Sequence, residues 1–376
     1  MSGIYFHIPF CKVKCSYCDF YKTTNTSRLT DLVRSLKLEL WLRRDYLTDF
    51  HIETIYFGGG TPSLLAPDHI EDLIRACSTI FKVGSEVEIT IEANPDDLSV
   101  DYLKALRKIG VNRISIGIQS FVHNDLKLMK RRHNSIQALN AVKFAREADF
   151  ANISVDLIYG TPNMSLQHWN DNLKQIFDLD IQHLSAYHLT YHQGTQLWDD
   201  LQKEKIKEIT EDESVKQFEL LINMAEEYDF KHYEISNFAR EGYFSKHNSS
   251  YWKQTEYLGL GPSAHSYNKV SRQWNVSSLT HYLLALSNQK IPFQLEQLFE
   301  KDRFNDYIIT SLRTMWGIDL EFLEREFSKK YVDHVEKIGE KYKAKNQLIL
   351  KENKLILDQR CMLISDGIIS DFMILN

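Results

Sequence analysis

Apolar and polar positions alternate in two regular ways along the first half of the chain. Short apolar runs with strand character lie at residues 4–8, 54–57, 86–92, 113–119, 152–158 and 183–189. Amphipathic segments with helical spacing separate them, at residues 30–47, 68–81, 99–109, 135–147 and 166–177. Successive β–α units predict a parallel sheet with right-handed crossovers. Because a complete barrel needs about eight such units, the pattern leaves an incomplete barrel or an open doubly wound sheet.

Residues that could bind a ligand follow the predicted strands at their carboxyl ends. They are Cys11, Cys15 and Cys18 after the first strand, the run 58–62 (GGGTP) after the second, and Glu92, Gln119 and Asp156 at or near the ends of the next three. In both architectures the ligand binds at that edge of the sheet. We therefore expect these residues to form one site.

The second half of the chain has a different pattern. Residues 190–235 predict a linker with a helix at 211–228, and residues 246–261 combine aromatic residues and glycines without clear periodicity. Beyond residue 291, helical patterns lead into two β-like runs at 347–351 and 354–357, which indicate a hairpin. We predict a partial barrel at 1–235, a connecting segment at 236–290 and a winged-helix-like helical domain at 291–376.

Composition narrows the class of protein. Of 376 residues, 43% are hydrophobic and 26% charged, which is enough apolar material for a packed core. The net charge of -6 argues against general nucleic-acid binding. We see neither a secretory signal pattern nor an apolar run near the roughly 18 residues that a spanning helix needs. We therefore expect a cytoplasmic protein, and peripheral membrane contact stays open.

The three N-terminal cysteines indicate a metal site. Five cysteines in all, three of them clustered as C-x3-C-x2-C, do not make a disulfide framework. Zinc usually takes four ligands from two pairs, and no second pair is present, although His7 is an alternative fourth ligand. Three thiolates suit a four-iron cluster that keeps one iron open.

These motifs together resemble the radical SAM superfamily, which uses S-adenosylmethionine (SAM). The runs HIPFC at 7–11, EANP at 92–95, SIGIQSF at 115–121 and DLIYG at 156–160 are similar to its coproporphyrinogen dehydrogenase-like branch. The resemblance implies an incomplete (β/α)6 TIM-like barrel with a C-terminal HemN-like domain. It also implies a [4Fe-4S] cluster on the three cysteines, with the amino and carboxylate groups of SAM on the fourth iron.

The resemblance also assigns residues to SAM. They are Tyr5, Tyr17, Gly59, Gly60, Thr61, Glu92, Gln119, Arg131 and Asp156. The glycines let the backbone approach a ligand closely, and the loop is not a P-loop because no Lys-Ser/Thr pair follows it. The family pattern Leu-Gly-Arg-x-His corresponds to MKRRH at 129–133 in this chain. Arg132 is therefore an alternative to Arg131 as the arginine that contacts SAM.

Phe20 separates two branches of the family. Oxygen-independent coproporphyrinogen III dehydrogenases carry a fourth cysteine at this position, whereas C-D-F is typical of HemW-type haem chaperones. That group also carries the motif HNxxYW, present here at 247–252. We predict that His247, Tyr251 and Trp252 bind haem, since histidine is a common haem ligand. The alternative is a buried, hydrogen-bonded histidine with a structural role.

The resemblance thus implies a haem chaperone with haem as its cargo and a [4Fe-4S] cluster and SAM as cofactors. Its partners would be haem-acceptor proteins, membrane-associated ones included, with no nucleic acid, and a homodimer stays open. No catalytic residue is assigned. The first alternative is an oxygen-independent coproporphyrinogen III dehydrogenase, and the second is a zinc protein without redox chemistry.

Overall fold

The computed structural model describes residues 2–375. Strands β1 (Ser2–Ile8), β2 (His51–Gly59), β3 (Lys82–Ala93), β4 (Arg113–Gln119), β5 (Asn152–Tyr159) and β6 (His183–His188) alternate with helices along the first half of the chain. The connecting helices are α1 (Leu29–Leu42), α2 (Pro67–Ile80), α3 (Val100–Lys108), α4 (His123–Leu128), α5 (Ser135–Glu147) and α6 (Leu166–Phe177). The predicted β–α alternation is confirmed.

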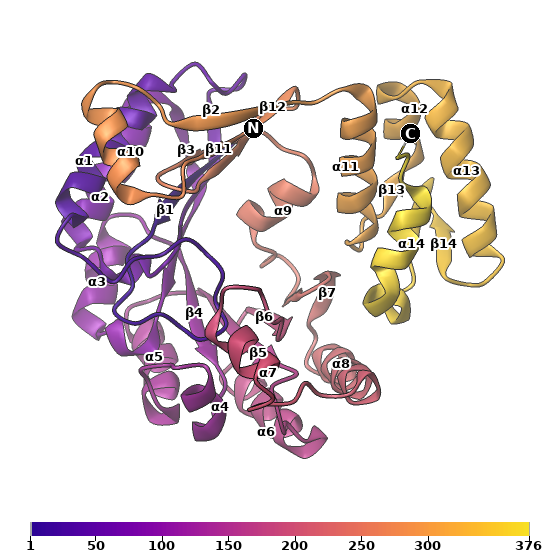
Figure 1. The fold of residues 1–376 in the computed structure, drawn as a ribbon, viewed down its shortest axis with the longest axis horizontal. Coiled ribbons are helices and arrows are strands. Elements are labelled where there is room, and N and C mark those ends of the chain that lie inside the picture. Colours follow the sequence, from indigo (N-terminus) through magenta and orange to yellow (C-terminus); the bar gives the residue numbers. More distant parts are fainter. Residues whose placement is uncertain (1, 376) are drawn as a thin grey trace.

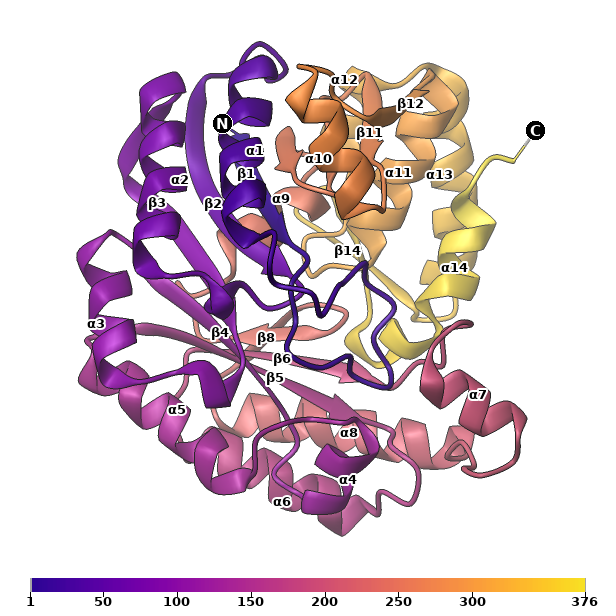
Figure 2. The same ribbon diagram turned by 60° about the vertical axis from the view of Figure 1, so that its left-hand side comes forward.

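The parallel sheet curves into an incomplete barrel. Strands β1 to β6 lie in sequence order, and each pairs in parallel with the next. A doubly wound sheet would reverse this order at a switch point, so that alternative is excluded. Figure 2 shows helices α1, α2, α3, α5 and α6 along the outside of the curved sheet.

Local signals explain where several helices begin and end. The Ser99 hydroxyl accepts a hydrogen bond from the Tyr102 amide at the start of α3, and Gly110 (φ +101°) follows its end. Asn134 and Gln137 form a capping box at the start of α5. These bonds satisfy backbone groups that a helix end leaves open, so the helices begin where the apolar pattern predicts.

Later segments extend both edges of the sheet. On the β1 edge are β9 (Tyr257–Leu260), β10 (His265–Tyr267), β11 (Ser271–Asn275) and β12 (Phe293–Gln297), and on the β6 edge are β8 (Asn237–Ala239) and β7 (Lys231–Glu234). Helices α7 (Gln196–Gln202), α8 (Glu211–Glu227), α9 (Lys246–Trp252) and α10 (Leu279–Ser287) connect them. The boundaries at 235 and 290 stay a prediction, although β12 pairs with β11 across the second one.

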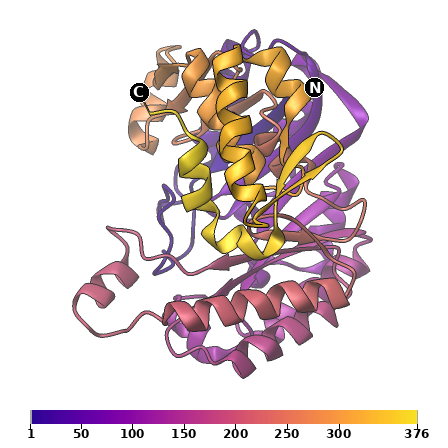
Figure 3. The same cartoon turned by 90° about the vertical axis from the view of Figure 1, so that its right-hand side faces the viewer.

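The C-terminal part is helical with a small sheet. It contains α11 (Glu300–Leu312), β13 (Ile318–Asp319), α12 (Leu320–Glu326), α13 (Lys329–Lys343), β14 (Leu348–Lys351), β15 (Lys354–Leu357) and α14 (Ser365–Phe372). The predicted hairpin is confirmed, with Glu352 and Asn353 at positive φ in its turn. Figure 1 shows these helices as a group beside the barrel, with α9 between the two, and in Figure 3 the same helices lie in front of the barrel.

Side chains alternate between the outer and inner faces of the barrel strands. In β1, Ile4, Phe6 and Ile8 are fully buried in the apolar core shared with the outer helices. A Cβ placed on Gly58 would instead meet Tyr5, Tyr56 and Glu92, which therefore lie on the inner face. The interior of this barrel is polar and aromatic. Within residues 2–375, no helix is long and apolar enough to cross a bilayer.

Candidate functional site: a pocket at the carboxyl ends of the strands

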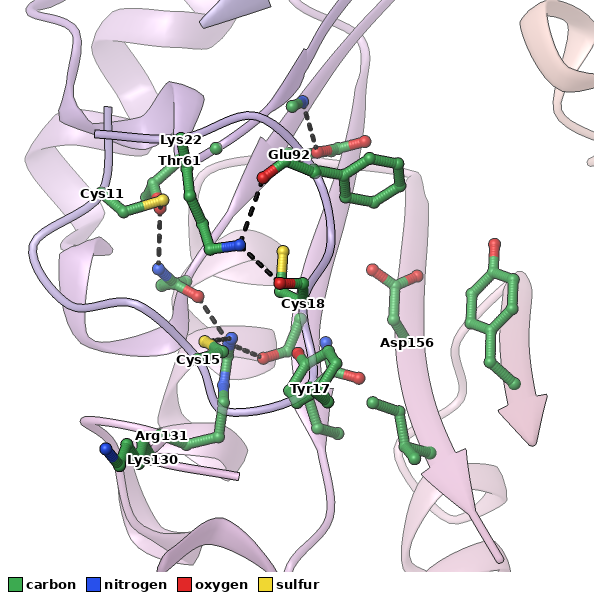
Figure 4. A pocket seen from close by; sticks show the side chains of 18 of the residues that line it. Cys11, Cys15, Tyr17, Cys18, Lys22, Thr61, Glu92, Lys130, Arg131 and Asp156 are labelled. Atoms are coloured by element: carbon green, nitrogen blue, oxygen red, sulfur yellow. Dashed lines mark hydrogen bonds between the residues drawn. The ribbon is translucent and has the colours of Figure 1, made fainter. Parts of the chain in front are cut away.

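A pocket of about 420 Å³ opens at the carboxyl ends of the parallel strands. The predicted cluster and SAM residues that line it are Cys11, Cys15, Tyr17, Cys18, Gly59, Gly60, Thr61, Glu92, Gln119, Arg131 and Asp156. Figure 4 shows the cysteine loop on one side and Asp156 on the strand opposite. The expectation that the strand-end residues converge is confirmed, whereas Tyr5, which the resemblance assigns to SAM, does not line the pocket.

The cysteine loop is held by the backbone around it. The Cys11 amide donates to the Thr23 carbonyl (2.9 Å), and the Ser16 amide and hydroxyl donate to the Met129 (3.2 Å) and Leu128 (2.6 Å) carbonyls. Lys22 Nζ donates to the Cys18 carbonyl at 2.5 Å. The loop is therefore held in place by hydrogen bonds along its length.

The arrangement of the three thiols is compatible with a four-iron cluster. All three are free, and within residues 2–375 no three Cys, His, Asp or Glu side chains converge as the ligands of one metal ion would. Each thiolate of a four-iron cluster binds its own iron, so convergence on one point is not required. His7 does not complete a zinc site, since its ring nitrogens lie 3.2 Å from Tyr5 Oη and 3.1 Å from the Tyr21 carbonyl.

Two of the sulfur atoms accept hydrogen bonds from the pocket wall. Thr61 Oγ1 donates to Cys11 Sγ, and Arg131 Nη1 donates to Cys15 Sγ, both at 3.4 Å. Burial raises the pKa of the Cys11 thiol, and the Thr61 bond opposes that rise. Metal binding needs the thiolate, so donors that stabilise negative sulfur favour ligation.

The glycine loop packs tightly against the first strand. Gly59 has φ +107°, and a Cβ there would lie 2.6 Å from the His7 ring. A Cβ on Gly60 would lie 2.7 Å from the Phe10 carbonyl oxygen and 2.8 Å from that of Ile8. The Gly60 amide donates to the Ile8 carbonyl at 2.8 Å. Gly59 is thus required by its backbone angle and by the His7 ring, and Gly60 by the nearby backbone of residues 8–10.

Glu92 forms part of the pocket floor. Its Oε1 accepts from Tyr56 Oη (2.8 Å), and its Oε2 accepts from the Gly59 amide (3.2 Å). Burial raises the pKa of Glu92 to about 7, while the Tyr56 hydrogen bond acts in the opposite direction. A carboxyl group with free lone pairs at this position can accept a hydrogen bond from a ligand amine or hydroxyl.

The structure distinguishes between the two neighbouring arginines. Arg131 Nη2 donates to Asn94 Oδ1 (2.5 Å) and to the Gly117 carbonyl (2.6 Å), and Figure 4 shows its side chain beside Cys15. Arg132 is engaged by Asp96 (2.8 Å) and Asp97 (3.1 Å). Arg131 Nε is buried and has no partner among residues 2–375. An unsatisfied donor beside the thiols fits a site that is completed by a polar cofactor.

Two further predicted residues complete the wall. Asp156 Oδ1 accepts from Ser115 Oγ (3.1 Å), and burial raises the pKa of this carboxyl group. Gln119 has φ +67° where β4 ends, an uncommon conformation for a residue with a side chain.

Asn94 is a pocket residue that was not predicted. Its Oδ1 accepts from Arg131, and its Nδ2 donates to Thr61 Oγ1 at 3.3 Å. It therefore connects the two side chains that contact the cysteine sulfurs. The signal was present in the sequence, because Asn94 stands in the EANP run two residues after Glu92, at the end of a predicted strand.

The structure does not bring Tyr5 or the HNxxYW residues to the pocket. Tyr5 lies beneath the floor, where its ring stacks on Tyr56 with centroids 6.0 Å apart. His247 is 2% exposed on α9, and its ring nitrogens lie 2.7 Å from Thr54 Oγ1 and 2.8 Å from Tyr251 Oη. Haem binding by His247, Tyr251 and Trp252 stays a prediction.

Comparisons with known proteins agree with this geometry. The family model of the radical SAM superfamily matches residues 5–176. Heme chaperone HemW of Bacillus subtilis is 32% identical over 334 residues, which make up 88% of this chain and 87% of that protein. Heme chaperone HemW of Lactococcus lactis is 33% identical over 329 residues, 87% of this chain and 85% of the relative.

Among solved structures, coproporphyrinogen III oxidase (HemN) from Escherichia coli, a radical SAM enzyme by its description, superposes with a TM-score of 0.84. The match covers 99% of this chain and 89% of that one at 23% sequence identity. At this identity the likeness shows the fold, and it includes the C-terminal helical part.

Proposed function

This chain belongs to the HemW family within the radical SAM superfamily, and from that membership we propose that it binds haem and transfers it to acceptor proteins. The observation that supports this proposal is a sequence identity of about one third to haem chaperones over most of both chains. We further propose that a [4Fe-4S] cluster and SAM occupy the pocket at the strand ends. The free state of all five cysteines suits a reducing, cytoplasmic setting.

Different residues of the pocket would bind the [4Fe-4S] cluster and SAM. The three cysteines of the loop would bind three irons, with Thr61 and Arg131 stabilising the negative charge on sulfur. Glu92 and the glycine loop would receive the amino end of SAM, and Arg131 Nε offers a further donor. When bound and reduced, the cluster supplies an electron that can cleave the SAM sulfonium.

Phe20 supports the chaperone assignment over the dehydrogenase. It lines the pocket mouth and is 64% exposed, so an aromatic ring stands where the dehydrogenase pattern has a thiol. An exposed aromatic side chain at the mouth offers a flat apolar surface, which suits a porphyrin and contributes no acid–base or metal chemistry.

Haem binding by His247, Tyr251 and Trp252 would require a rearrangement. The His247 imidazole would have to give up its contacts with Thr54 and Tyr251 before a ring nitrogen could bind iron. Breaking contacts to a buried polar group costs about 1–3 kcal/mol for each group left unsatisfied. We therefore propose these residues as haem ligands only for a form in which α9 has left the barrel.

A second candidate function is oxidative decarboxylation of coproporphyrinogen III. The observation that favours it is the superposition with the Escherichia coli oxidase over 99% of this chain. Both functions need a site for a tetrapyrrole and both occur on this fold, so the fold alone does not separate them.

One experiment separates the two functions. The protein is reconstituted anaerobically with iron and sulfide and titrated with haem, with and without SAM, while visible spectra are recorded. Haem-loaded protein is then mixed with apomyoglobin, and separately the reduced protein is incubated with SAM and coproporphyrinogen III. We expect a haem spectrum, transfer to the apoprotein and no protoporphyrinogen. Protoporphyrinogen formed over many turnovers, or the absence of haem binding, would refute the chaperone function.

A further inference from the structure

A column of stacked rings connects the pocket floor to helix α9. Tyr56 donates from its hydroxyl to Glu92, and its ring stacks on the His247 imidazole with centroids 4.8 Å apart and planes inclined by 23°. Tyr5 lies beside both rings, 6.0 Å from Tyr56 and 6.2 Å from His247. His247 is therefore two contacts away from a carboxyl group that binds the Gly59 amide.

The imidazole is fixed in this position from several directions. Hydroxyl groups of Thr54 and Tyr251 lie at its two ring nitrogens, and its backbone amide donates to Glu88 Oε1 at 3.0 Å. Glu88 Oε2 accepts from the Lys246 amide at the same distance, so a strand carboxylate holds the start of α9. Burial, with a smaller effect from Arg113, lowers the pKa of His247 to about 3. The imidazole is therefore neutral and is held in a fixed position by these contacts.

We propose that His247 is a positioning residue for the pocket. Its ring holds the Tyr56 ring, and Tyr56 holds the Glu92 carboxyl group against the glycine loop. His247 and Tyr251 of the HNxxYW motif then pack into the barrel interior, with Tyr251 supplying the hydroxyl at the second ring nitrogen. The inference rests on the proposed binding of SAM in this pocket, and it gives the motif a role that haem ligation does not require.

The test measures SAM affinity of the cluster-loaded protein by equilibrium binding. Replacing His247 with Ala removes the nearer of the two rings that stack on Tyr56, so the hydroxyl that binds Glu92 Oε1 is held less firmly. We expect the dissociation constant for SAM to rise roughly three- to tenfold, the range set by loss of one aromatic contact. His247→Gln keeps a planar polar group between Thr54 and Tyr251, so it should recover part of the affinity.

His183 provides a matched control in the same barrel. It is fully buried, and its ring nitrogens lie 2.7 Å from Ser154 Oγ and 2.7 Å from Tyr233 Oη. Its ring packs against Tyr233, on the β6 side, and does not stack on Tyr56. His183→Ala therefore empties a comparable imidazole site, and it should change the SAM dissociation constant by no more than about twofold.

A double-variant cycle tests the proposed connection. Tyr56→Phe keeps the ring but removes the hydroxyl that reaches Glu92. Because His247 and Tyr56 act through the same carboxyl group, the double variant should weaken SAM binding by less than the product of the two single effects. Independent effects that multiply would overturn the connection. If His247→Ala is insoluble, Thr54→Val carries the test, since it removes only the hydroxyl beside the imidazole.

Haem titration of the same variants separates the inference from the proposed function. Weakened SAM binding is the expected result for His247→Ala, and a haem spectrum lost at the same time would show that the residue also binds iron in the rearranged form. Unchanged SAM binding with loss of the haem spectrum would overturn the inference and assign iron ligation to His247. Wild-type protein that bound no SAM would overturn the proposed occupation of the pocket as well.

Discussion

Replacing Gly59 with alanine should destabilise the protein and disable the pocket together. The backbone at Gly59 has φ +107°, and an added Cβ would lie 2.6–3.0 Å from three atoms of the His7 ring. The left-handed conformation costs a residue with a side chain about 1–2 kcal/mol. Overpacking adds about 1–3 kcal/mol, and His7 cannot easily yield because both its ring nitrogens have partners. We expect a total loss of about 2–5 kcal/mol.

Two other glycines separate these contributions. Gly194 also has positive φ (+88°), but a Cβ there would meet nothing within 4 Å, so Gly194→Ala measures the backbone cost alone. Gly84 has open space and no positive φ, so Gly84→Ala should be close to neutral. Urea unfolding of the cluster-free proteins gives the three stabilities, and iron content after reconstitution reports the pocket. A Gly59→Ala loss no larger than that of Gly194→Ala would refute the packing argument.

Two further predictions concern single side chains of the pocket. Cys15→Ser should abolish the visible absorbance and iron content of the cluster while the protein stays soluble, because Cys15 lies on a loop outside the apolar core; insoluble protein would contradict this. Glu92 has a folded-state pKa of about 7 against 4.5 in the unfolded chain, so between those values the folded state keeps a proton that the unfolded state has lost. Stability contributed by this proton is present at low pH and falls as pH rises through that window, and Glu92→Gln should remove this part of the slope in denaturation curves measured across it. Parallel curves for the two proteins would contradict the raised pKa.

The sequence predicts local patterns well and long-range pairing poorly. Strand β4 and helices α5 and α6 occupy the predicted residues, because their own apolar spacing defines them. Strand β12 (FQLEQ), by contrast, has only exposed residues, and its apolar–polar alternation spans five positions, too few to stand out from the flanking sequence. It is a strand because β11 pairs with it. Strands of this kind cannot be predicted from periodicity.

The same division applies to the site. The cysteines, glycines and Glu92 were predicted because they stand at strand ends, where the topology alone brings them together. Tyr5 stands in the middle of β1, so its side chain lies beneath the floor although its motif resembles a SAM-binding one. The depth of His247 depends on the course of residues 246–260 back to β1, a pairing that the sequence pattern does not predict.

The pairing of β9 with β1 bears on how the protein is made. Strand β1, which leads into the cysteine loop, lies between β2 and β9, and residues 3–6 pair with residues 257–260. Ribosomes synthesise the N-terminal residues first, at roughly 5–20 residues per second. The time between synthesis of β1 and synthesis of β9 is therefore on the order of ten seconds or more. During this interval β1 has an open edge, which can pair with other chains. The cysteine loop therefore follows a strand whose pairing in the sheet is completed late in synthesis. Iron supplied after residues 257–260 have left the ribosome would reach a loop whose strand already has both of its neighbours.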